Sequence, residues 1–596
     1  MSSEPATPLA APVSPRGQAG RKPAIVGKPR RRAMPKSSLR ANGEPMIWLT
    51  GGALAVSLAM IIGLMMLVFF QGVDTFWPQP VIVVKTHTGE SFLGEVTRSE
   101  VFEPGEQVFE ALPEELAPRL EKSVRAAGGL AERRLVRTGN FELTGTHFNW
   151  VSDFLVAEET RPEWAVVVER LSWGRFYGMP KAFNLDGKRV AESPAAAWAL
   201  FTEHHAVVRD RWEEWRSLKH YELGAIGKAE EQTRRDMVQA RLDHGADSEE
   251  FRQRKAEYEE RKRSSTVEGG RIKKRIAELV AENDKYKLVM QTNDGQEVLL
   301  KLEEIVRAYP ANRLNLMSKL GIYGSRWVEF LADEPREANS EGGVYPAIFG
   351  TVAMTLLMSL AVVPFGVLAA LYLREYAKAG PIVSAVRIAI NNLAGVPSIV
   401  FGVFGLGFFC YTLGWNIDQL FFESKLPNPT YGTGGLMWAS FTLALLTLPV
   451  VIVATEEALS AVPNSMREGS YACGAGKWQT IRRIVLPRAM PGIMTGMILA
   501  MSRGAGEVAP LMLVGAVKLA PDLVLDGVFP FVHPERSFMH LGFHIYDVGF
   551  QSQNSEAAKP MVYTTTLLLI ALIALLNFTA VWLRARLRRQ FVSSQF

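Results

Sequence analysis

The sequence predicts an all-α membrane protein with six transmembrane helices and a large α+β insertion between the first helix and the second. The first observation is a set of apolar runs that each reach the roughly 20 residues needed to cross a bilayer. They lie at 46–70, 347–373, 390–413, 435–455, 490–516 and 561–583. The second observation is a polar stretch of roughly 270 residues after the first run, which is large enough for one or two domains. The mean hydropathy of +0.06 averages these two populations.

The first 45 residues are rich in Pro, Ser, Ala, Gly and basic residues, a composition that predicts a disordered tail. The apolar run at 46–71 that follows is too long for a secretory signal peptide and lacks a small-residue cleavage pattern. A group of basic residues directly precedes this run: Arg30, Arg31, Arg32, Lys36 and Arg40. Because basic flanks stay in the cytoplasm, we expect the N-terminus there.

Three further basic segments fall on the same side if the chain crosses the membrane six times. They are the connection between runs two and three, the connection 456–488, and the C-terminal tail 586–596 with the arginines just before it. The net charge of +5 and the pI of about 9.0 therefore indicate membrane orientation rather than nucleic-acid binding. We expect a multi-pass protein of the bacterial inner membrane with both termini in the cytoplasm.

The insertion, residues 72–345, is then expected on the outer, periplasmic side. Alternating apolar residues predict strands in 81–96, 141–151, 163–171 and 286–302, with hairpin turns at Thr88–Gly89 and Asn293–Gly295. From about 194 to 283 the pattern is helical and densely charged, and we expect breaks at Gly245 and at Gly269–Gly270. This predicts a small β domain carrying a protruding helical or coiled-coil part. Its charges form either a solvated face or a docking surface.

Several classes of function lack support in the sequence. Only two cysteines are present, Cys410 and Cys473, and neither lies in the insertion, so disulfides cannot hold that segment. No phosphate-cradling G-x-x-x-x-G-K-[ST] loop is present, so we do not expect this chain to hydrolyse ATP. His540 and His544 are four residues apart with Asp547 near by, but the segment is short of further metal ligands. We expect no metal site, no cofactor bound by this chain and no catalytic residues.

Two of the apolar runs carry polar or irregular features. Thr351, Thr355 and Ser359 are four residues apart in the second run and share one helical stripe. Such a stripe serves either helix packing or a polar path. The third run begins irregularly around Gly395 and Pro397, and non-helical backbone at membrane depth is tolerated only beside protein or a water-filled cavity.

The connection at 456–488, which we term the coupling loop, has a specific spacing. Glu468, Gly469 and Ser470 are followed after three residues by Gly474, and nine residues later by Ile484, Leu486 and Pro487. We expect a short helix at 468–473, a turn at Gly474, and a second helix at 477–485 that Pro487 ends. Such a pair of helices forms a protrusion that another protein can grip.

The fifth run contains a charged pair and a stripe of small residues. Gly492, Gly496, Ala500 and Gly504 recur every four residues, so another helix can approach closely. Arg503 and Glu507 are also four apart, and we expect them to share a helix face. Arg503 lies about 18 Å from Pro491 at ~1.5 Å per residue, near the bilayer midplane. An arginine at that depth costs on the order of 2.5–3.5 kcal/mol, so it implies a compensating partner or a function.

Two interpretations of Arg503 and Glu507 remain open at this point. The two side chains either neutralise one another and hold helices together, or they line a path for an anion. A guanidinium group matches a tetrahedral oxyanion through paired donors and stays charged. The carboxylate beside it would limit the affinity for the anion, because a path must also release its cargo.

The coupling loop resembles the "EAA" loop of permease subunits in bacterial binding-protein-dependent ABC importers, with Gly469–Ser470 where that family often has two alanines. The strings NNLAGVPSIVFGVFGLGFF (391–409) and SRGAGEVAPLM (502–512) resemble the PstA-type permease subunits of phosphate importers. The resemblance covers roughly 46–70 and 346–585 and leaves out the insertion. It implies the type I ABC permease architecture, with 346–585 as the permease domain.

The resemblance also implies partners and a mechanism. The partners would be a PstC-like second permease, a PstB-like ATPase dimer that binds ATP and Mg, and a PstS-like phosphate-binding protein. Closure of the ATPase dimer would pull on the coupling loop and open the path. The alternatives are a permease for another oxyanion such as sulfate or molybdate, a PstC-type subunit, and a membrane-anchored sensor. A sensor would have one or two spans and a cytoplasmic output domain.

Overall fold

The computed structural model describes residues 44–593 except 111, 114, 115, 127, 528–530, 553 and 554, so the predicted disordered tail lies almost wholly outside the described residues. Among them, six helical stretches are long and apolar enough to cross a membrane, as the sequence predicts. They are Met46–Asp74, Tyr345–Tyr376, Ser398–Phe421, Leu436–Ser460, Lys477–Gly506 and Ser555–Arg586. The last of these belongs to α19 (Ser555–Ser593), whose helix runs on into the segment we assigned to a C-terminal tail.

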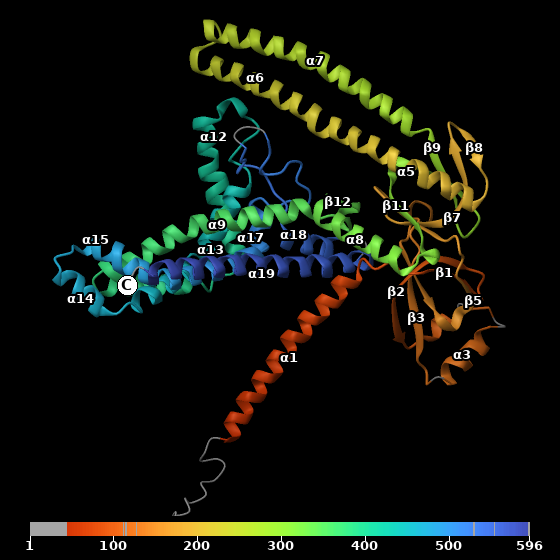
Figure 1. Ribbon diagram of the computed structural model, residues 1–596, viewed down its shortest axis with the longest axis horizontal. Coiled ribbons are helices and arrows are strands. Elements are labelled where there is room, and N and C mark those ends of the chain that lie inside the picture. The colour runs from red at the N-terminus through yellow and green to blue at the C-terminus, as the bar shows by residue number, and fades with distance from the viewer. Residues whose placement is uncertain are drawn as a thin grey trace, which may run out of the picture. The chain divides into compact units, whose positions relative to one another are not determined.

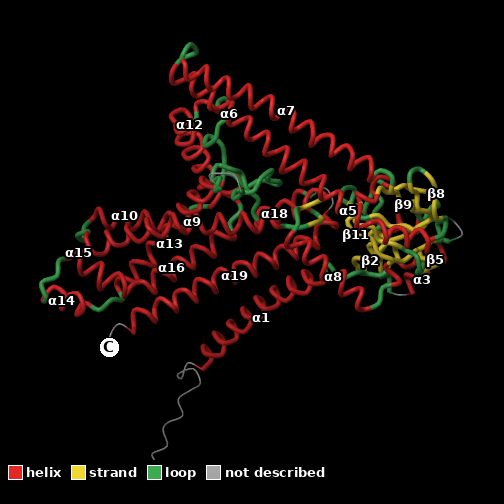
Figure 2. Tube along the Cα trace, turned by 45° about the horizontal axis from the view of Figure 1, so that its top comes forward, coloured by secondary structure: helices red, strands yellow, loops and turns green. Residues whose placement is uncertain are grey.

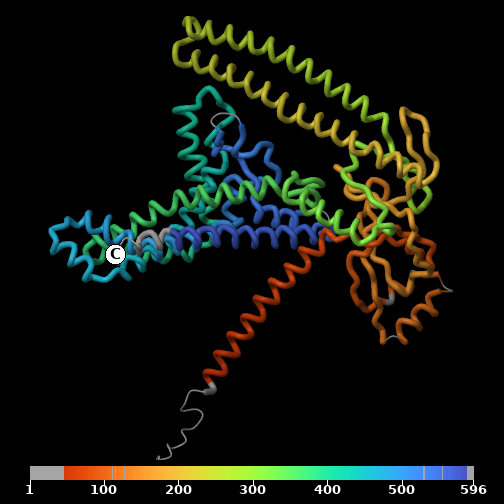
Figure 3. Tube along the Cα trace, viewed as in Figure 1, coloured from red at the N-terminus to blue at the C-terminus, as the bar shows by residue number. Residues whose placement is uncertain are grey.

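The centre of the helical bundle is α13 (Leu436–Ser460), which packs against both α9 (Tyr345–Leu371) and α16 (Leu486–Gly506). Buried side chains from these helices, among them Met354, Leu443 and Ala500, form one hydrophobic cluster. Figure 3 shows by colour that segments far apart in sequence meet here, because α9 in green lies beside α16 in blue. Only 11% of the apolar window of the last span, in α19, is buried by the rest of this chain. This is expected for a helix that faces lipid or another subunit.

The third and fifth spans differ in extent from the sequence prediction. Residues 390–397 belong to a separate helix, α10 (Pro381–Leu393), and to the non-helical segment that follows it. The third span begins only after Pro397 and comprises α11 (Ser398–Phe404), a π-helical stretch (Gly405–Gly414) and α12 (Trp415–Phe421). The fifth span does not run to 516, because α16 ends at Gly506 and a short helix, α17 (Ala509–Val514), follows.

The insertion contains two antiparallel sheets, which hold most of the strands in Figure 2. The first sheet has the order β4-β3-β2-β1-β5, with β1 (Val81–Thr86), β2 (Ser91–Phe102), β3 (Ala131–Arg137), β4 (Phe148–Ser152) and β5 (Val156–Thr160). The second has the order β10-β9-β7-β6-β11 with β8 on β7. Its strands are β6 (Val166–Arg170), β7 (Phe176–Leu185), β8 (Lys188–Ala191), β9 (Tyr286–Gln291), β10 (Glu297–Lys301) and β11 (Ile305–Pro310).

Both predicted hairpins are present, because β1 pairs with β2 and β9 with β10, each across a glycine at positive φ. The predicted strand at 141–151 is only half correct: Phe141–Thr144 forms the short helix α4, and β4 begins at Phe148. The remaining helices around the sheets are α2 (Glu106–Glu110), α3 (Ala117–Ala126) and α8 (Leu316–Ala332), the last of which leads towards α9. A two-residue pair, β12 (Pro335–Arg336) with β13 (Glu341–Gly342), lies between α8 and α9.

The charged part of the insertion is helical, as predicted. It consists of α5 (Pro194–Ser217), a π-helical turn (Leu218–Glu222), α6 (Leu223–His244) and α7 (Glu249–Asn283). Figure 1 shows α6 and α7 side by side as a helical hairpin. Gly245 adopts φ +87° and ends α6, so the expected helix break is present at this position. Gly269–Gly270 does not, because α7 continues through both; Gly269 is buried near Leu223 of α6, and this packing offsets the roughly 1 kcal/mol that a helical glycine costs.

Candidate functional site

The coupling loop forms two short helices at one end of the bundle (Figure 1). The first, α14 (Asn464–Ala472), carries Glu468, Gly469 and Ser470. Gly474 follows at φ +80°, a conformation that favours glycine, and α15 (Lys477–Thr480) begins three residues later. The hydroxyls of Ser470 and Thr480 lie 2.8 Å apart and join the two helices. The two short helices of the loop are therefore held to each other by a side-chain hydrogen bond.

The tip of this unit exposes large aromatic side chains that the sequence analysis did not single out. Tyr471 and Trp478 are 43% and 56% exposed, and Glu468, Gly469 and Gly474 are exposed as well. Exposed aromatics beside charged residues are typical of surfaces that another protein covers. Their position next to the motif was visible in the sequence, but their exposure depends on the fold.

The prediction that Pro487 ends the second helix is wrong. A π-helical turn (Ile481–Val485), which contains Ile484, joins α15 directly to α16, whose first residues are Leu486 and Pro487. The whole stretch Lys477–Gly506 is helical. A proline lacks an N–H donor and its ring crowds the carbonyl one turn earlier, and the wider π turn before it supplies the room. As a result, the exposed loop and the membrane-spanning helix form one continuous element.

A second connection between the coupling loop and the membrane helices is made by Arg467 of α14. Its guanidinium donates to the backbone carbonyl of Leu459 (2.7 Å), in the last turn of α13, and to that of Val462 (2.5 Å), two residues beyond the helix end. It also pairs with Glu375, beyond the end of α9, at 3.0 Å. The side chains of Arg467 and Glu375 are only 13% and 10% exposed. Arg467 thus ties α14 to two membrane helices besides α16.

The small residues of α16 lie where neighbouring helices come close. A Cβ atom added at Gly492 or Gly496 would lie 2.4 Å or 2.7 Å from alanine side chains of α13. Ala500 is fully buried, and a Cβ atom at Gly504 would lie 2.4 Å from the sulfur of Met358 on α9. Larger side chains at these positions would separate α16 from the helices at the centre of the bundle.

The charged pair lies at the end of α16 rather than within a helix. Glu507 has extended backbone (φ −77°, ψ 139°), so the prediction that Arg503 and Glu507 share one helix face is wrong. Gly506 and Pro510 on either side explain the break, because Pro510 has no N–H to donate to the carbonyl of Gly506, four residues earlier, and its ring crowds that carbonyl. The two side chains still meet, with Arg503 Nε 3.5 Å from Glu507 Oε1. They are 38% and 21% exposed, and Arg503 has no second carboxylate partner among the described residues.

Several other polar side chains of the membrane helices make hydrogen bonds within the chain. The hydroxyls of Thr351, Thr355 and Ser359 are buried and each donates to the carbonyl four residues earlier. Thr351 also accepts the N–H of Leu541. Asp418, which the sequence analysis did not consider, is fully buried and accepts N–H groups of a tight turn at 430–432. These hydrogen bonds use the hydroxyl and carboxylate groups within the helical bundle.

His540 and His544 are buried after the fifth span. Among the described residues, no group of three His, Cys, Asp or Glu side chains could hold a metal ion. Asp547 instead pairs with Lys518 at 3.0 Å. Burial lowers the pKa of His540 to about 3, and burial is also the main reason that the pKa of His544 falls to about 4. Both histidines are therefore neutral at physiological pH.

These histidines predict a loss of stability in acid. Their pKa values in the folded protein lie below the ordinary value of about 6.5, so the unfolded chain binds more protons. The two neutral histidines contribute fully to the free energy of unfolding above about pH 6.5. This contribution falls as the pH is lowered towards 4, by on the order of a few kcal/mol for the two groups together. We expect the thermal midpoint of His544→Phe to fall less between pH 7.5 and 4.5 than that of the unchanged protein. His220→Gln, at an exposed histidine, should behave like the unchanged protein.

Comparison with known proteins adds to this geometry. Residues 362–589 match the family of binding-protein-dependent transport system inner membrane components, a range that contains the coupling loop, Arg503 and Glu507 but not the insertion. A phosphate transport system permease protein PstA of Mycobacterium leprae is 40% identical over 31% of this chain and 56% of its own length. The PstA of Yersinia pestis is 35% identical over 32% and 59%.

A third relative is covered more fully. The PstA 2 protein of Mycobacterium bovis is 31% identical over 40% of this chain and 70% of its own length. The chain spans about half the length of the first curated relatives that it matches. The residues matched by the family model, 362–589, do not include the insertion.

Proposed function

This chain belongs to the PstA family of phosphate transport system permease proteins, and from that premise we propose that it forms half of the transmembrane path of an ATP-driven phosphate importer. The observation that carries the proposal is the continuous helix from the exposed coupling loop to Arg503. In a permease, the surface that binds the ATPase subunit outside the membrane must be connected to the residues that contact the substrate inside it. In this chain the two are one element.

The substrate contact is assigned to Arg503 and Glu507. Phosphate near neutral pH carries between one and two negative charges, and a guanidinium group offers it paired donors. Arg503 contacts Glu507 at 3.5 Å, which is longer than a good hydrogen bond, and it remains 38% exposed. It can therefore turn towards an anion, while Glu507 limits the affinity so that the anion is released.

The coupling loop is assigned to a separate, PstB-like ATPase dimer, which binds ATP and Mg. Glu468, Tyr471 and Trp478 offer that partner a charged and aromatic surface. Movement of α14 would reach α13 and the end of α9 through Arg467, and movement of α15 would reach α16 directly. The chain itself binds no cofactor and carries out no covalent step.

The remaining assignments concern orientation and partners. Basic residues on the coupling-loop side, including Arg374, Lys378 and Arg387, favour a cytoplasmic position for that side and for both termini. The insertion then faces the periplasm, where a PstS-like phosphate-binding protein would dock. A PstC-like subunit would cover apolar surface of this bundle and complete the path.

Uptake by cells that depend on this chain tests the function. We expect uptake of radiolabelled phosphate to require the chain, and excess unlabelled phosphate to abolish the signal while equal sulfate or molybdate does not. If sulfate or molybdate competes equally well, the substrate is a different oxyanion. If the purified chain carries no ATPase subunit, the assignment as an ABC importer permease is wrong.

A further inference from the structure

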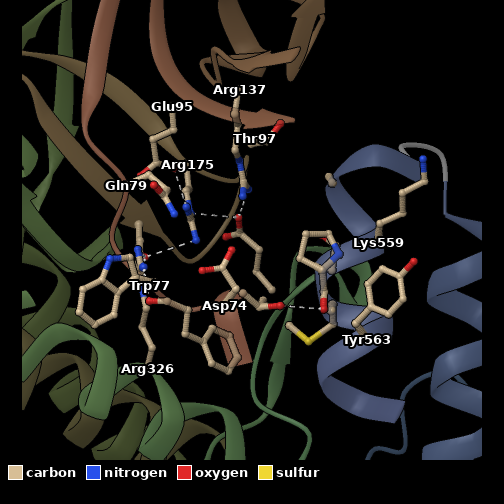
Figure 4. A pocket seen from close by; sticks show the side chains of 18 of the residues that line it. Asp74, Trp77, Gln79, Glu95, Thr97, Arg137, Arg175, Arg326, Lys559 and Tyr563 are labelled. Atoms are coloured by element: carbon tan, nitrogen blue, oxygen red, sulfur yellow. Dashed lines mark hydrogen bonds and ion pairs between the residues drawn. The ribbon is translucent and has the colours of Figure 1, made fainter. Parts of the chain in front are cut away.

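A cavity of about 390 Å³ lies between the two sheets of the insertion and the outer ends of two membrane helices (Figure 4). Its floor is formed by residues 71–77, at the end of α1 (Glu44–Asp74), and by residues 556–563 at the start of α19. Its volume falls within the roughly 300–1,000 Å³ typical of small-molecule sites. None of the residues discussed for transport lines it.

The wall of this cavity holds more basic side chains than acidic ones. Its seven basic side chains are Arg98, Arg137, Arg175, Arg307, Arg326, Arg336 and Lys559. Its six acidic side chains are Asp74, Glu95, Glu169, Glu329, Glu341 and Glu556. Buried charges in proteins are normally paired, and here one positive charge is left in excess.

Three of the arginines converge on Glu169, which is 7% exposed. Arg307 Nη1 lies 2.6 Å from this carboxylate, Arg326 donates to it as well, and Arg175 Nη2 lies 3.8 Å away. Burial by itself would raise the pKa of Glu169, but these positive charges hold it far below its usual range. The carboxylate therefore stays ionised, and its one negative charge is shared among several arginines.

Two arginines of the wall use few of their donors. Arg175 makes one hydrogen bond to a carboxylate, to Glu95 at 2.9 Å, and Arg137 makes one, to Glu341 at 2.5 Å. A guanidinium group carries five N–H donors. The Nε atoms of both arginines are buried without a hydrogen-bond partner among the described residues. Their side chains are 16% and 13% exposed.

The rim of the cavity lies beside the ends of two candidate membrane spans, Met46–Asp74 and Ser555–Arg586. Arg98 and Lys559 stand at the rim with 43% and 48% of their side chains exposed, and both contact the same carboxylate, Glu556. Trp77 and Tyr563 also line the cavity, and such aromatic residues are enriched at the level of lipid headgroups. An anion could enter here either from solution or from the headgroup of a lipid.

We propose that this cavity binds one phosphate group, held by Arg137 and Arg175 and admitted past Arg98 and Lys559. Guanidinium groups bind phosphate oxygens through paired hydrogen bonds, and the ligand would supply the negative charge that the wall lacks. The site is separate from Arg503 and does not depend on the proposed transport function. The group comes either from free orthophosphate or from an anionic phospholipid.

Thermal unfolding of the delipidated full-length protein in detergent tests the proposal with two probes. The first is orthophosphate, compared with chloride at equal ionic strength. The second is phosphatidylglycerol, compared with diacylglycerol, which lacks the phosphate. We expect at least one probe to raise the midpoint by about 3 °C or more, because a ligand that binds only the folded state stabilises it. The probe that does so identifies the source of the phosphate group.

Two variants on the same strand make the result specific. In Arg137→Gln the dissociation constant of the effective probe should rise by about tenfold or more, because a charged donor is lost. Arg134→Gln is the matched control, since Arg134 lies three residues away and pairs with Asp153 and Glu159 outside the cavity. If Arg137→Gln does not fold, Arg137→Lys replaces it and should bind more weakly than the unchanged protein.

Arg503→Gln separates this cavity from the transport path and should keep the full shift. The proposal is overturned if neither probe stabilises the unchanged protein. It is also overturned if the Arg137 and Arg134 variants respond alike, or if the shift disappears in Arg503→Gln.

Discussion

Arg503→Gln is expected to lower phosphate uptake by about tenfold or more, while the protein still assembles in the membrane. Glutamine keeps a polar side chain of similar length but removes the fixed positive charge and the paired donors. Arg503 packs loosely and its contact with Glu507 is long, so its loss should disturb the fold little. The measurement is initial uptake of radiolabelled phosphate, normalised to the amount of protein that co-purifies with the ATPase subunit.

Two further variants sharpen this result. Arg584→Gln removes an arginine near the end of the last span, where it donates to Thr495, and it should leave uptake close to normal. Glu507→Gln should raise the apparent affinity for phosphate and slow turnover, because the competing carboxylate is lost. Normal uptake in a normally assembled Arg503→Gln protein would show that this pair only holds helices together.

Arg467→Met is expected to separate ATP hydrolysis from transport. Methionine keeps much of the apolar volume but loses the bonds to the carbonyls of α13 and to Glu375. Because α14 would still present its exposed surface, the ATPase subunit should still bind. Movement of that subunit would no longer reach α13 and α9, so uptake should fall by about tenfold or more, since buried charge-assisted bonds fix this geometry.

The measurements for this variant are phosphate uptake and the response of ATP hydrolysis to the binding protein, both on the purified complex. Arg483→Met is the matched control, because Arg483 lies in the π-helical turn and is exposed. Arg467→Lys should recover part of the coupling, since lysine can still pair with Glu375 but cannot make all the bonds. A complex of Arg467→Met in which uptake and stimulated hydrolysis stay normal would rule out this role of Arg467.

The features predicted correctly from sequence are those set by local chemistry. Apolar length predicts the six spans because bilayer thickness is nearly constant. Asn293–Asp294–Gly295 predicts a hairpin because glycine adopts the positive φ that the turn needs, and Gly474 marks the turn between the two coupling helices for the same reason. The close approach of other helices to the glycine stripe of α16 was likewise predictable, because it depends only on the small size of these side chains.

The features that were missed depend on contacts between distant residues. Gly269–Gly270 resembles a helix end, yet α6 packs beside it and α7 continues. The partner of Arg467 is Glu375, 92 residues earlier, so no local pattern reveals the pair. The end of α16 is a different case. Gly506 and Pro510 are residues that favour a helix end, but the continuous apolar run around them predicts a longer helix. The cavity in the insertion draws its arginines from segments about 240 residues apart in the chain, from Arg98 to Arg336.

One contact at the base of the insertion bears on how such a chain could arise. The side chain of Asn312 accepts the N–H of Val81 at 3.1 Å and donates to its carbonyl at 2.8 Å, so the first strand is fastened to the last part of the β domain. Segments that start and finish at neighbouring points can be spliced into a host with little disturbance. The β domain begins and ends at neighbouring points, so it could be inserted between two membrane helices as a single module.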